Sequence, residues 1–200
     1  QKISELFSGK LYMNENANRK NFIDATTSFS LHHLAMHSLL ENDYSKSSLV
    51  FSGGQKVYFD ELYQLNFPSD LVVLSACNTG IGTMESGEGM MSLSRALTYS
   101  GVKSSVYSLW QVPDKETSEI MISFYENLKN GQPKDEALAN AKKEFLANNP
   151  MKQHPFYWAG FVVNGDISPI ANPTNNWIWF ALAGGILIVI LGFVFRKKLF

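Results

Sequence analysis

The chain has 200 residues, of which 45% are hydrophobic and 18% are charged, and its formal net charge is −1. This composition excludes an intrinsically disordered chain and lacks the basic excess of a protein that binds nucleic acid directly. The single cysteine cannot form an intramolecular disulfide, so we expect a fold that does not depend on oxidation. The chain begins at Gln1 without a signal peptide, and we therefore expect it to be the C-terminal part of a longer protein.

Five short apolar runs, mostly bounded by turn or polar residues, predict buried strands. In chain order they are residues 29–35, 48–51, 71–75, 104–110 and 160–163. Residues at helical spacing predict three helices between them. The first ends near Gly101, the second has Asp114 as its N-cap and ends at Gly131, and the third has Pro133 in its first turn. Strands that alternate with helices predict an α/β fold whose mainly parallel sheet is covered on both faces.

The C-terminal part of the chain has a different character. Residues 167–176 read as a Pro/Asn-rich linker, and residues 177–195 then run for nineteen residues without a charge. A helix of that length crosses the roughly 30 Å hydrocarbon core of a bilayer. Trp177 and Trp179 stand at one margin and a basic cluster at 196–198 at the other, as in membrane spans. We expect a single-pass transmembrane helix, although a buried core helix is the alternative.

The orientation of this helix follows from its flanking charges. No Lys or Arg lies between Lys152 and Arg196, so the positive-inside rule predicts a cytoplasmic tail at 196–200. The preceding domain would then lie on the opposite side of the membrane, which we expect to be a bacterial inner membrane.

The only cysteine, Cys77, follows the apolar run 71–75, and His37 follows the run 29–35. Ligands of parallel sheets bind beyond the carboxyl ends of the strands. If the two strands are neighbours, the thiol and the imidazole face one crevice, and this pair is the minimum for a cysteine nucleophile with a histidine that relays its proton. From the residues alone, the alternative that Cys77 is a small buried residue of the core also stands.

Six stretches in this order closely resemble the CHAT domain, a caspase-like family often found after tetratricopeptide repeats in bacterial proteins. They are HLAMHS (33–38), SSLVF (47–51), DLVVLSACNTGIG (70–82), the run 87–114 with LWQVPD at its end, the run 124–145, and HPFYWAGFVVNGD (154–166). The resemblance covers roughly residues 7–166, and we take 1–166 as the domain. It implies the three-layer α/β sandwich that caspases, separases and gingipains share.

The resemblance also implies roles for particular residues. Cys77 of LSACNTG would attack a peptide carbonyl, and His37 of HLAMHS would protonate the leaving amine. Backbone N–H groups of Ser38 and Cys77 would hold the oxyanion of the tetrahedral intermediate. The family usually has glycine where this chain has Ser38, but a serine N–H can serve if its dihedral angles allow. His33 lies within the predicted strand and His154 begins a packing motif, so we interpret both as structural.

Two further residues are candidates for the substrate pocket. Several relatives that cleave after Arg or Lys carry an acidic residue two positions before the cysteine, where this chain has Ser75. Serine offers no charge, so this position does not predict basic specificity. The stretch LWQVPD resembles one that helps to build the pocket of separases, which makes Asp114 a candidate pocket acid; its role as a helix N-cap is the alternative.

No cofactor or metal is expected. The glycine-rich stretch 79–89 lacks the Gly-Lys-Ser/Thr end of a P-loop, and its glycines miss the G-x-G-x-x-G spacing, so we interpret it as a loop beside the active site. One cysteine and scattered histidines do not have the spacing of metal ligands.

The sequence therefore predicts a membrane-anchored, caspase-like cysteine endopeptidase of the clan CD type. It would cleave protein or peptide substrates and would be regulated by upstream repeats or a partner that binds them. One alternative is a catalytically inactive CHAT-type interaction module tethered to the membrane; the retention of Cys77 and His37 counts against it. A transferase or hydrolase that uses the same pair on a non-peptide acyl substrate is a third hypothesis.

Overall fold

The centre of the fold is a four-stranded sheet with the order β1-β5-β6-β7. The computed structural model describes residues 2–41, 46–75 and 86–170. Strands β1, β5 and β6 run parallel, and β7 pairs antiparallel with β6. The predicted, mainly parallel sheet is thus confirmed. Its strands are β1 (Leu31–Leu34), β5 (Leu71–Leu74), β6 (Ser104–Ser108) and β7 (Phe161–Gly165).

Strand β5 shows why the sheet is covered on both faces. All four of its residues are buried, as expected of a parallel strand with a continuous apolar run. Because successive side chains point to opposite faces, Val72 and Leu74 enter one hydrophobic cluster and Leu71 and Val73 enter the other.

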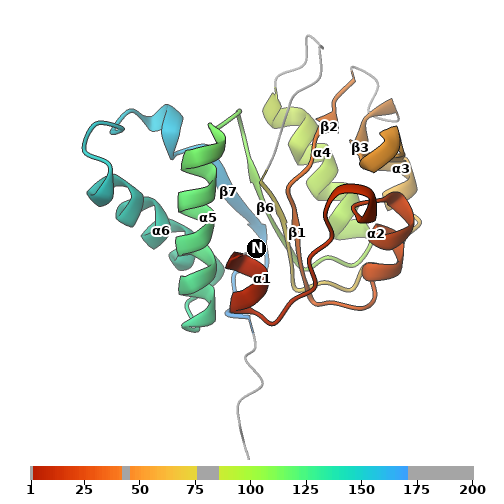
Figure 1. Cartoon of the computed structure of the whole chain (residues 1–200), viewed down its shortest axis with the longest axis horizontal. Helices are drawn as coiled ribbons and strands as arrows, with labels where there is room; N and C mark the ends of the chain where they lie inside the picture. The colour runs from red at the N-terminus through yellow and green to blue at the C-terminus, as the bar shows by residue number, and fades with distance from the viewer. Residues whose placement is uncertain (1, 42–45, 76–85, 171–200) are drawn as a thin grey trace, which may run out of the picture. The chain divides into compact units, whose positions relative to one another are not determined.

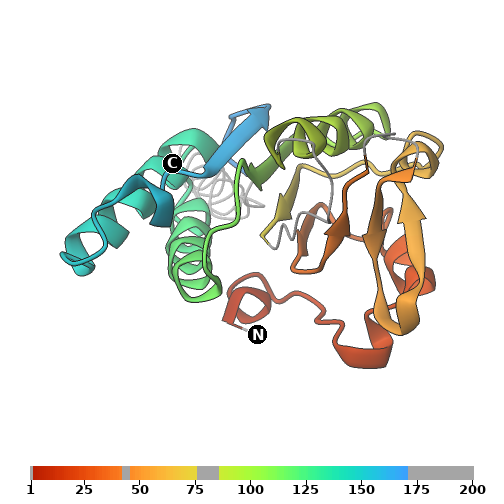
Figure 2. The same ribbon diagram turned by 90° about the horizontal axis from the view of Figure 1, so that it is seen from above.

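Helices form the two outer layers of the sandwich (Figures 1 and 2). α1, α5 and α6 pack on the face of Leu71 and Val73, whereas α2, α3 and α4 pack on the face of Val72 and Leu74. This arrangement gives the three layers expected from the sequence. The helices are α1 (Lys2–Leu6), α2 (Arg19–Ala25), α3 (Phe59–Leu62), α4 (Ser86–Tyr99), α5 (Asp114–Lys129) and α6 (Lys134–Asn148), with 3-10 turns at Asn14–Asn16, Ser52–Gly54 and Pro155–Tyr157.

A second, three-stranded sheet was not predicted. It has the order β2-β3-β4, with antiparallel pairing throughout, and consists of β2 (Ser38–Leu39), β3 (Ser48–Val50) and β4 (Lys56–Tyr58). The run 48–51 therefore forms a strand, but it belongs to this sheet and not to the central one. The strands that pair with it, β2 and β4, have only two and three residues, and a strand this short shows no periodic pattern in the sequence.

The predicted starts of two helices are each wrong by one residue. α5 begins at Asp114 with Pro113 in the N-cap position, and α6 begins at Lys134 with Pro133 in the N-cap position. Both prolines have extended backbone, with ψ of 147°, so neither is the first helical residue. Asp114 therefore is not an N-cap, although its carboxylate still lies in the first turn, where the helix dipole favours negative charge.

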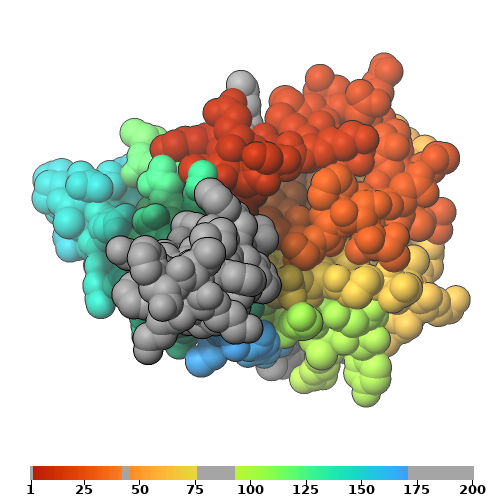
Figure 3. Space-filling view, turned by 90° about the horizontal axis from the view of Figure 1, so that it is seen from below, coloured from red at the N-terminus to blue at the C-terminus, as the bar shows by residue number. Residues whose placement is uncertain are grey.

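The N-terminal segment crosses from one helical layer to the other. α1 packs against α5, where Phe7 meets Tyr125 edge-on at 5.9 Å between ring centroids and Lys2 forms an ion pair with Glu126 at 2.9 Å. The chain then runs along the surface to α2, as the red segment in Figure 3 shows. The segment thus connects the α5 layer to the α2 layer.

Glycine is required at the end of β7, where Gly165 has φ of +97° and a Cβ would collide with the carbonyl oxygen of Lys103.

Among the residues that the structure describes, no helix is long and apolar enough to span a membrane. The predicted span at 177–195 lies outside those residues.

Candidate functional site

The carboxyl ends of β1 and β5 meet at one edge of the central sheet. The two strands are parallel neighbours, with His33 opposite Val73 and Leu34 opposite Leu74. One residue beyond β5, the Ser75 N–H donates to the Leu34 carbonyl oxygen at 3.2 Å. The adjacency on which the sequence hypothesis depended is therefore confirmed.

His37 lies at this edge, in the connection between β1 and β2. Its side chain is exposed, and its backbone carbonyl accepts a hydrogen bond from the Val50 N–H at 2.9 Å. The backbone on either side of His37 is thereby held by both sheets, while the imidazole is open to a ligand.

Cys77 lies outside the described residues, in the gap between 75 and 86. Ser75 is the last described residue before it, so the chain leaves toward Cys77 from the same sheet edge as His37. The pairing of Cys77 with His37 stays a prediction.

Ser38 follows His37 and begins β2, an edge strand of the second sheet. In an antiparallel ladder, hydrogen-bonded pairs alternate with pairs that exchange no hydrogen bonds. The Val50 N–H donates to the His37 carbonyl, so His37 and Val50 are a hydrogen-bonded pair. The next pair, Ser38 and Leu49, therefore exchanges no backbone hydrogen bonds. The Ser38 N–H therefore points away from β3, as a backbone donor for a ligand would.

Ser75 is joined to a partly buried network that the sequence did not predict. Its Oγ lies 2.8 Å from His33 Nε2, and His33 Nδ1 lies 3.0 Å from the hydroxyl of Tyr125 on α5. Tyr125 is completely buried, and burial raises the pKa of its hydroxyl. Burial also lowers the pKa of His33 to about 4, so this imidazole is neutral at physiological pH.

The interpretation of His33 as structural agrees with these contacts, whereas Tyr125 was missed. A signal for it existed, because Met121, Tyr125 and Leu128 share the spacing of one helix face. His32 alternates to the other face of the sheet, where its ring nitrogens lie 3.1 Å from Ser69 Oγ and 3.1 Å from the Ala25 carbonyl oxygen.

The low pKa of His33 should make stability depend on pH. The unfolded chain binds a proton near the ordinary pKa of 6.5, but the folded chain binds it only near pH 4. The free energy of unfolding is therefore highest above about pH 6.5. It falls by roughly 3 kcal/mol as the pH is lowered from about 6.5 to about 4. Burial also lowers the pKa of His32, which acts in the same direction.

Urea unfolding at about pH 7 and about pH 4.5 measures this loss. The variant His33→Gln can still hydrogen-bond but cannot titrate, and we expect a smaller loss in it than in the wild type. Equal losses in the two proteins would show that His33 is not the titrating group.

Asp114 is exposed at the start of α5. Within the described part of the chain it makes no side-chain hydrogen bond or ion pair, and no contact joins it to Ser75. The structure therefore brings Ser75 beside His33 at the sheet edge but does not bring Asp114 to the same cluster.

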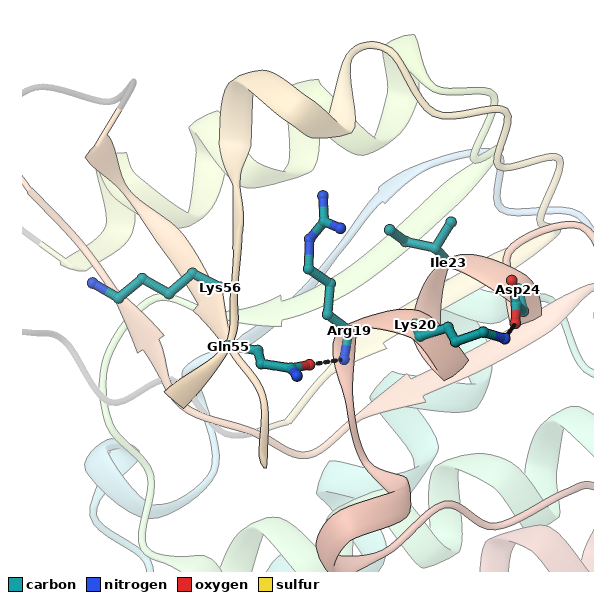
Figure 4. Close-up of a pocket in the computed structure, with 6 residues that line it drawn as sticks. All are labelled: Arg19, Lys20, Ile23, Asp24, Gln55 and Lys56. Atoms are coloured by element: carbon teal, nitrogen blue, oxygen red, sulfur yellow. Dashed lines mark hydrogen bonds and ion pairs between the residues drawn. The ribbon is translucent and has the colours of Figure 1, made fainter. Parts of the chain in front are cut away.

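Two surface hollows lie elsewhere. One, of about 520 Å³, lies between α2 and the start of β4 (Figure 4). Two of its cations are paired, Lys20 with Asp24 at 2.6 Å and Arg19 with Glu61 outside the hollow at 2.5 Å. The other, of about 460 Å³, lies between α5 and α6 and is lined by several carboxylates. Neither contains His37 or Ser75.

The protein is thus an α/β sandwich whose candidate site residues lie beyond the carboxyl ends of two parallel strands, β1 and β5. The sequence model of the CHAT domain matches residues 1–166, and the chain belongs to the CHAT domain family. Tetratricopeptide repeat protein 28 of Homo sapiens and of Mus musculus are each 29% identical to it over 115 residues. The match covers 58% of this chain and 5% of each relative, so the chain spans only a small part of the curated relatives.

Two solved structures have a similar fold. The complex of the pro- and mature domains of RgpB from Porphyromonas gingivalis has a TM-score of 0.57 at 15% identity, covering 85% of this chain and 42% of that one. The Arg-specific cysteine proteinase gingipain R has a TM-score of 0.58 at 16% identity, covering 85% and 41%. At these identities the likeness is one of fold.

Proposed function

We propose that this chain is a caspase-like cysteine endopeptidase whose reacting groups are Cys77 and His37. The observation that supports the proposal most strongly is the parallel pairing of β1 with β5, because His37 follows the first strand and the chain toward Cys77 follows the second. Membership of the CHAT domain family and a fold like that of a cysteine proteinase support the same conclusion.

The proposed reaction has two steps. The Cys77 sulfur attacks the peptide carbonyl carbon, and the C–N bond breaks as His37 gives a proton to the leaving amine. Water, deprotonated by His37, then attacks the acyl-enzyme and releases the thiol. The N–H groups of Ser38 and Cys77 would stabilise the oxyanion, and a Ser38 N–H that points away from β3 suits that role. Ser75 and Asp114 remain the candidates for substrate contacts.

A peptide carrying an electrophile that traps cysteine nucleophiles tests this proposal. Incubation with the full-length protein should add one peptide to Cys77, identified by mass spectrometry, and a peptide library should be cleaved. Cys77→Ala should remove both signals. Labelling that survives Cys77→Ala would contradict the proposal, and the absence of both labelling and cleavage, with upstream region and partners present, would favour an inactive interaction module.

We further propose that residues 177–195 anchor the domain in a membrane as a single-pass helix, with 196–200 on the cytoplasmic side of a bacterial inner membrane. The uncharged run with its aromatic and basic margins supports this anchoring. Deleting residues 177–200 should move the protein from the membrane fraction to the soluble fraction. A truncated protein that stays with membranes would contradict the assignment.

Regulation by an upstream region is also part of the proposal. The similar tetratricopeptide repeat protein 28 is named for repeats of this kind. Such repeats form extended concave surfaces that bind partner proteins. A partner that binds one conformation more tightly by roughly 5 kcal/mol can turn a two-state switch almost completely.

A further inference from the structure

Tyr125, His33 and Ser75 form a hydrogen-bonded chain from the interior of the α5 layer to the sheet edge. The hydroxyl of Tyr125 lies 3.0 Å from His33 Nδ1, and His33 Nε2 lies 2.8 Å from Ser75 Oγ. Neither Tyr125 nor His33 has a role in the proposed reaction. The direction of the two hydrogen bonds, however, decides what Ser75 can offer to a ligand.

The buried end of the chain sets this direction. A neutral imidazole has one N–H donor and one bare nitrogen acceptor. Tyr125 is completely buried, and within the described residues His33 Nδ1 is the hydrogen-bonding partner of its hydroxyl. If Nδ1 carried the proton, the Tyr125 O–H would be left without an acceptor. The cost of a buried, unmade hydrogen bond favours the other tautomer by roughly tenfold or more.

The same reasoning then applies at the other end. With the Tyr125 O–H donating to Nδ1, the proton of His33 is on Nε2 and is donated to Ser75 Oγ. Ser75 accepts that bond, so its own hydroxyl proton is directed elsewhere. Ser75 is only partly buried and lies at the carboxyl end of β5, at the edge where His37 follows β1.

We propose that Tyr125 and His33 are positioning residues that make Ser75 a hydrogen-bond donor toward the substrate. This inference rests on the proposed function. A hydroxyl proton that is free to donate favours a substrate group that carries an acceptor oxygen, so Gln, Asn, Glu or Asp should bind better against Ser75 than Met, which has no such oxygen. Ser75 Oγ keeps a second lone pair after it accepts the bond from His33, so Lys or Arg could also hydrogen-bond to it, and the informative comparison is with Met.

The tautomer can be measured without any activity. In the full chain labelled with ¹⁵N-histidine, NMR correlations between ring nitrogens and ring protons distinguish the two neutral forms, and His33→Gln assigns the His33 signals. We expect the Nε2–H form for His33 in the wild type and a larger share of the Nδ1–H form in Tyr125→Phe. A wild-type His33 in the Nδ1–H form, or charged at neutral pH, would overturn the proposal.

The substrate preference is measured by cleavage of a peptide library in the full-length protein. At one substrate position we expect peptides with Gln, Asn, Glu or Asp to be cleaved about 2- to 10-fold better, through KM, than peptides with Met, which is isosteric with Gln. Ser75→Ala should abolish this ratio, Ser75→Thr should restore it, and Tyr125→Phe should weaken it. Ser123→Ala, on the outer part of α5, is the matched control and should leave the ratio unchanged.

The outcomes separate the two proposals. Cleavage by the wild type with no acceptor preference, or a preference that persists in Ser75→Ala, would overturn the role of Ser75 while leaving the endopeptidase intact. If the wild type cleaves nothing, the proposed function fails and the role of Ser75 toward a peptide fails with it, whereas the NMR result still decides the direction of the hydrogen bonds.

Discussion

Replacing Cys77 with alanine should lower the rate of peptide cleavage by on the order of 10⁴-fold or more. Cys77 is the only thiol in the chain, so no other thiol can replace it as the nucleophile. The oxyanion donors and the binding surface would remain, which is why a small residual rate is compatible with this prediction. The measurement is kcat/KM for a peptide that the wild type cleaves.

His37→Ala should cost about 10²- to 10⁴-fold in the same assay, because it removes the group that we propose to transfer the proton. His154→Ala is the matched control, since His154 is likewise exposed and precedes the 3-10 turn Pro155–Tyr157 as its N-cap, where its Nδ1 accepts a hydrogen bond from the Phe156 N–H. We expect wild-type cleavage in that variant. Equal losses in the two histidine variants would remove the special role of His37.

The second large effect is on stability. Phe124 is completely buried in the cluster that α5 and α6 form on the sheet, with its ring 5.5 Å from that of Tyr125. Phe124→Ala should lower the free energy of unfolding by about 3–5 kcal/mol, because it removes apolar burial and leaves a cavity. Urea unfolding followed by circular dichroism measures the loss.

Phe156→Ala provides the control for this change. The side chain of Phe156 is 45% exposed, and the hydrogen bond from Trp110 Nε1 is to its backbone carbonyl, so truncation leaves that bond in place. We expect a loss of less than about 1 kcal/mol. A comparable loss in both variants would show that burial in this cluster does not dominate the stability of the domain.

Much of the central layer could be predicted from the chain alone. The run 71–75 is apolar without alternation, which is the mark of a strand covered on both faces, and Leu71 to Leu74 are indeed all buried. The glycines at 101 and 131 have the positive φ values expected just beyond helix ends. These features depend on local sequence, so a local pattern reveals them.

Features that depend on distant pairing were harder to predict. Periodicity could not decide whether β1 and β5 are neighbours, because their residues are about forty positions apart; the condition was met in the structure. The second sheet was missed, since Ser38–Leu39 gains its pairing only from β3. The contact between His33 and Tyr125 joins residues 92 positions apart, and no motif links them.

Two boundary errors have a simple cause. Asp suits both the N-cap and the first turn of a helix, and Pro133 was expected in a first turn but occupies the N-cap; a sequence pattern places a helix boundary only to within one or two residues. The error changes the interpretation of Asp114, which is an exposed first-turn carboxylate and not a cap. Its carboxylate, free of a capping role, stays a candidate for a substrate contact.

The pH dependence of the alkylation of Cys77 tests most directly whether Cys77 and His37 form one site. Because the chain has a single cysteine, iodoacetamide reports on that thiol alone. A protonated imidazole beside the thiolate should give the wild type a second inflection at lower pH, whereas His37→Ala should show the single inflection of an ordinary thiol near about pH 8.5. Superimposable profiles for the two proteins would contradict the pairing.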